Sequence, residues 1–229
     1  MRKGLNRNQL KYIAIITMIM DHIAFSFIPW SNPVYFIFRF LGKLTAPIMC
    51  YFLAEGYNYT SSKMKYGFRL FIFAIISQFA FCLAFYNTLF IFKFNMICTL
   101  FICFLVLLSY DKIKNKLIKY ISIILLIIVS YFCDWGTFAP LWVLFFYIFK
   151  GRITAQVISY DIITIFVIVF KYILIKTLPW NSLLIYLGLL LFIPFIYLYN
   201  GEKGNNNKFN KWFFYIFYPL HLLIIIALS

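Results

Sequence analysis

Acidic residues are scarce in this chain, and so are histidines. The 229 residues include only six Asp or Glu and two His, against 21 Lys or Arg. Charged residues make up 12% of the sequence and hydrophobic residues 65%, whereas a soluble domain typically has about 25% charged and about 45–50% apolar residues. This balance excludes a soluble globular domain and a disordered chain. Recurring apolar stretches of about 20 residues instead predict an all-α, polytopic transmembrane helical bundle.

Clusters of metal ligands are missing as well. The five cysteines lie inside apolar runs without a CxxC pair, and only two histidines could assist them. We interpret these cysteines as small apolar side chains and expect neither a metal nor a disulfide framework. The net charge of +15 would suit nucleic-acid binding if it formed one block, but the basic residues fall between apolar runs. We therefore expect no nucleic-acid partner.

The apolar runs predict about nine spans, within a range of about eight to ten. We expect them at about 10–29, 34–55, 68–86, 94–110, 117–133, 136–149, 155–176, 182–199 and 211–228. The segment 199–212 is rich in Gly, Asn and Lys and predicts a solvated turn. We expect one integral-membrane domain over 1–229, with its chemistry inside the bundle or at its mouths.

Positive charge predicts the orientation in the lipid bilayer. With a cytoplasmic N-terminus and nine spans, the C-terminus lies outside and only Lys93 and Lys176 fall in outer loops. The inner side then receives Arg2, Lys3, Arg7, Lys11, Lys63, Lys65, Arg69, Lys112, Lys114, Lys116, Lys119, Lys150, Arg152, Lys203, Lys208 and Lys211. The Phe-, Ile-, Asn- and Lys-rich composition indicates an AT-rich genome, so we expect a multi-pass protein of a bacterial inner membrane.

Asp21 and His22 lie side by side within the first predicted span. A charge at mid-membrane costs roughly 2.5–3.5 kcal/mol on insertion scales and usually faces the bundle interior. Neighbouring helical residues point about 100° apart, so we expect these two side chains to meet different partners. His22 could act as a base or nucleophile near neutral pH. Alternatively, both serve only helix packing, with Asp21 neutralised by Arg39 or Lys43.

Arg39 and Lys43 are four residues apart and share one face of the second predicted span. Two like charges together in a membrane need an anion. Either Asp21 or a phosphate or carboxylate of a ligand could supply it. Pro47 follows one turn later and can loosen the backbone there.

Glu55 ends the second predicted span at the inner side, close in sequence to Lys65 and Arg69. These residues predict a basic mouth suited to a phosphorylated donor from the cytosol. Arg69 is the stronger candidate because it already lies within an apolar run. For Lys63 we favour ordinary positive-inside charge.

Two further candidates lie in the second half of the chain. Asp134 belongs to an Asp-Trp-Gly turn between two predicted spans, and His221 follows Pro219 inside the last one. A lone intramembrane His is often an interhelical hydrogen-bond donor. We place His221 at a depth similar to His22, so both could belong to one buried site. Asp161, in the seventh span, receives no role beyond helix pairing.

Several segments together resemble the TraX family. They are "LKYIAIITMIMDHIAFSF", "FRFLGKLTAPIMCYFLAEGYNYT", "KYGFRLFIFAIISQFAF", "DWGTFAPLWVLFFY", "YNGEKG" and "FYIFYPLHLLII", in the order of the family. The family is named for a conjugation-plasmid protein that acetylates the N-terminus of pilin in the membrane. It is also similar to membrane acyltransferases that use cytosolic acyl-CoA.

The resemblance implies acyltransferase chemistry. Its motifs fall on Asp21, His22, Arg39, Pro47, Glu55, Lys65, Arg69, Asp134, Gly136, Pro219 and His221. The chain departs from the family pattern at Ala24, where Gly is usual, at Lys43, where Arg is frequent, and at Gln78, where an acid is frequent. These departures bear on acceptor specificity more than on proton transfer.

We therefore expect an acetyltransferase that moves an acetyl group from acetyl-CoA to an amine or hydroxyl of a peptide, pilin-like protein or glycan. His22 is the general base or acyl carrier, oriented by Asp21 or Asp134. Arg39 or His221 stabilises the oxyanion. Cofactor-binding candidates are Lys65 and Arg69, with Lys43 and Glu55.

Two alternatives remain open at the level of the sequence. A non-enzymatic transporter or export factor could use the same buried groups as a proton or anion site. A membrane assembly partner could use them for helix packing alone.

Overall fold

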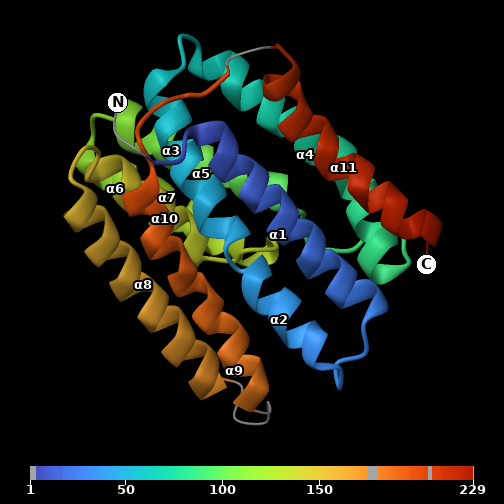
Figure 1. Cartoon of the computed structure of the whole chain (residues 1–229). Coiled ribbons are helices and arrows are strands. Elements are labelled where there is room, and N and C mark those ends of the chain that lie inside the picture. Colours follow the sequence, from blue (N-terminus) through green and yellow to red (C-terminus); the bar gives the residue numbers. More distant parts are fainter. Residues whose placement is uncertain (1–3, 175–179, 206–207, 229) are drawn as a thin grey trace. The chain divides into compact units, whose positions relative to one another are not determined.

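The computed structural model describes residues 4–174, 180–205 and 208–228 (Figure 1). Its helices are α1 (Arg7–Phe27), α2 (Pro33–Gly42), α3 (Thr45–Tyr59), α4 (Lys63–Tyr86), α5 (Met96–Lys112), α6 (Lys116–Val129), η1 (Ser130–Phe132), α7 (Phe138–Ile148), α8 (Ile153–Leu174), α9 (Trp180–Leu187), η2 (Gly188–Leu191), α10 (Phe192–Leu198) and α11 (Lys208–Leu228). Predictions for Arg2, Lys3 and Lys176 lie outside the described residues. Elsewhere the chain has two isolated β-bridges, and the described part contains no strand.

The all-helical prediction is confirmed for this part of the chain. Four segments are long and apolar enough to cross a membrane, namely Arg7–Phe27, Pro33–Tyr59, Lys63–Tyr86 and Ile153–Phe170. Shorter apolar helices cover Phe138–Ile148, Leu183–Leu198 and Trp212–Leu228. These lengths and compositions are those of a membrane protein.

Two predicted spans are broken rather than continuous. The segment 34–55 divides into α2 and α3 around Lys43, and 182–199 divides into α9, η2 and α10. Both breaks have the same physical basis. Pro47 and Pro194 each fall in the first turn of the helix that follows the break, where the missing N–H removes no intrahelical hydrogen bond.

The chain divides into two compact units. Unit 1 comprises Met1–Met49 and Gly151–Phe214 together with Ser229, and unit 2 comprises Cys50–Lys150 and Tyr215–Leu228. The boundaries therefore fall within α3, between α7 and α8, and within α11. The single acyltransferase-like domain over 1–229 stays a prediction.

Unit 1 is built on close packing of α1, α2, α8 and the α9–α10 segment. In Figure 1, α1 lies beside α2, and α8 lies beside α9 and α10. The 3₁₀ helix η2 packs closely on α2 at Gly188, because a Cβ there would collide with the Phe40 carbonyl oxygen. The polar loop predicted at 199–212 begins as expected after α10. It bonds to the N-terminal segment through Asn200, whose N–H donates to the Leu5 carbonyl at 3.0 Å.

Unit 2 is organised around α5, which packs on α4, α6 and α7. The buried Asn95 caps the N-terminus of α5 by accepting from the N–H groups of Ile97 and Cys98. Its amide group also donates to the Ala74 carbonyl and to Gln78, which in turn donates to the Lys93 carbonyl. Gln78 thus uses its amide nitrogen as a donor, which a carboxylate lacks.

Candidate functional site

An ion pair joins the first two helices of unit 1. Arg39 donates from Nη1 to Oδ2 of Asp21 at 2.7 Å, and the two side chains are 21% and 18% exposed. The approach depends on Gly42, one turn after Arg39, because a Cβ there would collide with the Asp21 side chain. Of the two partners considered for Asp21, the structure therefore selects Arg39.

The pair is incomplete as a hydrogen-bonding unit. Oδ1 of Asp21 and Nε of Arg39 are buried and make no hydrogen bond. Buried polar groups are normally satisfied, so unsatisfied atoms are informative about strain or a ligand. The Asp21–Arg39 pair therefore keeps one acceptor and one donor for a further polar group.

Lys43 takes a different direction from Arg39. Its ammonium lies 5.4 Å from the ring centroid of Tyr186 in α9, while the Arg39 guanidinium lies 5.5 Å from the ring of Phe25. Both are cation–π distances. The two cations thus contact aromatic rings on different helices. An anion that they share stays a prediction.

The two histidines belong to different units. His22 is half-buried on α1 in unit 1, directly after Asp21. His221 is 5% exposed on α11 in unit 2. Its Nδ1 lies 3.0 Å from the Phe217 carbonyl oxygen, and its ring stacks on Phe217. The single buried site for both histidines stays a prediction.

The tautomer of neutral His221 follows from this contact. A carbonyl oxygen can only accept, so Nδ1 must carry the proton in the hydrogen bond. Nε2 is then the basic atom. The neighbouring Tyr218, 1% exposed, accepts at its hydroxyl from the Met96 N–H at 3.4 Å.

Asp134 lies in a turn, as predicted. Its N–H donates to the Phe94 carbonyl at 2.9 Å, and the Gly136 N–H donates to the Cys133 carbonyl at 3.0 Å. Gly136 has φ of +60°, in the left-handed region that favours glycine. The Asp-Trp-Gly motif therefore closes the connection between η1 and α7.

The predicted basic mouth falls on α4 in unit 2. Arg69 is half-buried, and its guanidinium lies 5.7 Å from the Tyr66 ring centroid. Lys65 is exposed one turn earlier, while Glu55 is half-buried on α3. Arg69 thus contacts an aromatic side chain, whereas Lys65 is open to solvent.

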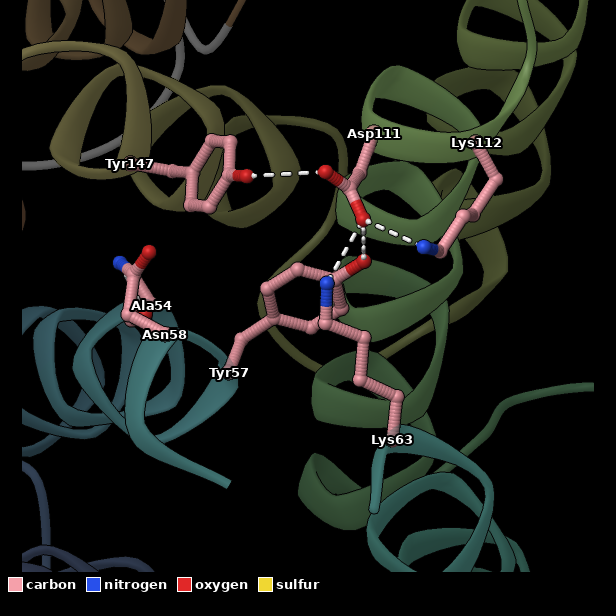
Figure 2. Close-up of polar contacts among 7 residues, drawn as sticks. All are labelled: Ala54, Tyr57, Asn58, Lys63, Asp111, Lys112 and Tyr147. Carbon is pink, nitrogen blue, oxygen red and sulfur yellow. Dashed lines mark hydrogen bonds and ion pairs between the residues drawn. The ribbon is translucent and has the colours of Figure 1, made fainter. Parts of the chain in front are cut away.

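A carboxylate that the sequence analysis passed over organises one end of unit 2. Figure 2 shows Asp111 between side chains from three other helices. Its Oδ2 accepts from Lys63 at 2.6 Å and from the Tyr57 hydroxyl at 3.1 Å, and its Oδ1 accepts from the Tyr147 hydroxyl at 3.3 Å. Lys112 lies 3.6 Å away. We call these five residues the Asp111 cluster.

The electrostatics of the cluster follow from these contacts. Asp111 lies just beyond the predicted span 94–110. Its hydrogen bond with the Lys63 ammonium lowers the pKa of the carboxyl below its usual range, despite partial burial. The sequence indicated this cluster only by one acidic residue among many lysines. Its partners are 54, 48 and 36 residues away, so no local pattern connects them. No group of metal-ligating side chains occurs in the described residues.

The family assignment comes from comparison with known proteins. A family model described as "TraX protein" matches residues 6–229. The chain belongs to the TraX family. It is also similar to the "Probable fimbrial assembly protein FimC, serogroup H1" of Dichelobacter nodosus, with 30% identity over 95% of this chain and 93% of that protein. No solved structure matches the chain.

TraX membership confirms the resemblance drawn from the motifs. Of the motif residues, Asp21 and Arg39 meet in unit 1, while Arg69, Asp134 and His221 lie in unit 2. This TraX protein is therefore a helical protein with membrane-compatible segments, and its relative is named for fimbrial assembly.

Proposed function

We propose that this TraX protein is an integral-membrane acetyltransferase that takes the acetyl group of cytosolic acetyl-CoA. The acceptor is an amine or hydroxyl of a membrane-associated or exported peptide, pilin-like protein or glycan. The family assignment and the fimbrial name of the relative support a substrate of this kind. The finer topology belongs to the same proposal: about nine spans in a bacterial inner membrane, with a cytoplasmic N-terminus.

The observation that carries the proposal is the incomplete Asp21–Arg39 pair beside His22. A pair made only for helix packing has no use for a buried acceptor and a buried donor that lack partners. A site that binds a substrate carbonyl and transfers a proton can use both the free donor and the free acceptor. Arg39 can donate to a developing oxyanion, and Asp21 can accept from the acceptor group or from an imidazole.

In the proposed reaction, His22 removes the proton of the acceptor amine or hydroxyl. The lone pair of the acceptor nitrogen or oxygen attacks the thioester carbonyl at the same time. The new C–N or C–O bond forms, the C–S bond breaks, and the proton passes to the departing thiolate. A positioned base typically contributes about 10²–10⁴-fold to the rate. Asp134 and His221 are the remaining candidates for orienting the imidazole and for the oxyanion.

On the donor side, Arg69 and Lys65 are assigned to the phosphates of acetyl-CoA, with Lys43 and Glu55 in supporting roles. Arg69 suits the task because guanidinium groups bind phosphate in a bidentate manner. Its contact with the Tyr66 ring limits its rotamers before a ligand arrives, which lowers the entropy cost of binding.

The proposal is tested with purified protein, acetyl-labelled acetyl-CoA and a peptide that has a free N-terminal amine and an apolar helix. We expect release of the CoA thiol together with label on the peptide. Binding of acetyl-CoA without release, or release that the peptide does not accelerate, would contradict transfer to such an acceptor. Transport of the peptide without labelling would favour an export factor.

A further inference from the structure

One end of unit 2 carries lysines around a single interacting carboxylate. Lys63 and Lys112 contact Asp111 itself. Beside them, the Lys150 ammonium lies 4.6 Å from the Tyr59 ring centroid and the Lys119 ammonium lies 5.1 Å from that of Tyr110. Two of these four cations contact Asp111, and the other two add positive charge beside the cluster. An anionic ligand can interact favourably with such a surface.

Lys63 is held firmly but remains accessible. It donates to Asp111 at 2.6 Å, and its ammonium lies 4.2 Å from the ring centroid of the buried Tyr57. The Lys63 and Asp111 side chains are 30% and 25% exposed. An anion from solvent can therefore reach the ammonium without unfolding the helices.

Asp111 keeps partners when Lys63 leaves. The Tyr57 and Tyr147 hydroxyls still donate to its two oxygens, and Lys112 still lies within ion-pair distance. The usual penalty for leaving a carboxylate unpaired is therefore small here. The Lys63–Asp111 contact is one that the protein can exchange at low cost.

We propose that Lys63 is a phosphate-binding residue for the nucleotide part of the acyl donor, and that Asp111 is a positioning residue that holds its ammonium until the phosphate replaces the carboxylate. The inference rests on the proposed function, whose donor side already uses Lys65 and Arg69 of the same helix. Lysine binds phosphate as a point charge without a fixed angular requirement. It can therefore exchange Asp111 for phosphate by rotation of its side chain.

The test measures the affinity of purified, full-length protein for adenosine 3′,5′-bisphosphate. We expect Lys63→Ala to weaken binding about tenfold, the scale of a hydrogen bond to a charged group. We expect Asp111→Asn to tighten binding about threefold, because the lysine no longer has to leave a carboxylate. The double variant should bind like Lys63→Ala.

Lys114→Ala is the matched control, because it removes the same charge from an exposed position just beyond α5. It should bind the bisphosphate like the wild type. Equal weakening in Lys63→Ala and Lys114→Ala would overturn the proposal in favour of general electrostatics. So would a folded Asp111→Asn variant with unchanged or weaker binding. Should Asp111→Asn not fold, the bisphosphate affinities of Lys63→Ala and Lys114→Ala are compared, and only a weaker affinity of Lys63→Ala supports the proposal.

Acetyl transfer separates this inference from the proposed function. In the transfer assay we expect Lys63→Ala to raise the KM for acetyl-CoA with little change in kcat, as for loss of uniform binding. Transfer with an unchanged KM would overturn the inference alone. The predicted pattern of bisphosphate binding without any transfer would overturn the proposed acetyltransferase and leave Lys63 in a nucleotide site.

Discussion

At the scale of single residues, two of the six acidic side chains form ion pairs with basic side chains. Asp21 meets Arg39 within unit 1, and Asp111 meets Lys63 within unit 2. The two pairs differ in burial and in completeness. The Asp21–Arg39 pair leaves buried atoms without partners, whereas both oxygens of Asp111 accept hydrogen bonds. This difference supports the proposed roles, in which the first pair takes part in chemistry and the second holds a cation.

The first prediction concerns Asp21→Asn. The substitution keeps the shape of the side chain but leaves the partly buried Arg39 charge uncompensated, so we expect a loss of about 1–3 kcal/mol in stability. Thermal unfolding in detergent micelles measures it. The double variant Asp21→Asn/Arg39→Gln removes both charges and should be more stable than Asp21→Asn alone. Two single effects that simply add would contradict the pairing.

The second prediction is a pH dependence at the Asp111 cluster. Since the folded pKa of Asp111 is lowered, its stabilising effect is fully present above the ordinary value of about 3.9 and is lost as the pH falls through the folded pKa. At pH 7 we expect Asp111→Asn to be less stable than wild type by about 1 kcal/mol or less, since the pair is partly exposed. The gap should close in melting experiments as the pH falls through the folded pKa, which lies below the ordinary value of about 3.9. A gap that stays constant with pH would contradict the ion pair.

At the scale of helices, sequence and structure agree on where each apolar segment lies and differ on two interruptions. The apolar runs at 34–55 and 182–199 look continuous, because periodicity reports burial and not backbone breaks. The prolines indicate the places, since Pro47 and Pro194 each fall in the first turn of the helix that follows the interruption. The Asp111 cluster could not be predicted in the same way. Its partners come from three helices, and no local pattern reports contacts over such separations.

The third prediction tests the packing of η2 on α2. Alanine at a helical glycine normally stabilises a helix by up to about 1 kcal/mol. Gly188→Ala should instead destabilise unit 1 by about 1–3 kcal/mol, because its Cβ would collide with the backbone carbonyl of Phe40. Gly56→Ala is the control, since the nearest atom to its Cβ is the movable Tyr66 hydroxyl at 3.1 Å. Melting points that rise in both variants would contradict this packing.

At the scale of the whole molecule, composition predicted the class of protein, while charge predicted its orientation. Four of the described segments are long and apolar enough to cross a membrane. The shorter apolar helices owe their assignment as spans to the alternation of basic loops along the sequence. That alternation is a global property, so a single missed span would reverse the side of every later loop.

The fourth prediction addresses this topology. Alkaline phosphatase fused after residue 229 should be active, because nine spans place that end outside the cytoplasm. The same enzyme fused after residue 205 should be inactive, because the basic loop there is predicted to be cytoplasmic. Activity at both positions, or the reverse pattern, would contradict nine spans with an inner N-terminus.

Acetyl transfer by wild-type protein and by His22→Ala, at matched amounts of folded protein, tests the proposed acetyltransferase. We expect release of CoA thiol and labelling of the acceptor peptide by the wild type. For His22→Ala we expect a rate lower by about 10²–10⁴-fold, the typical contribution of a positioned base. Equal rates for the two proteins would contradict the role of His22, and no turnover by the wild type would contradict the acetyltransferase itself.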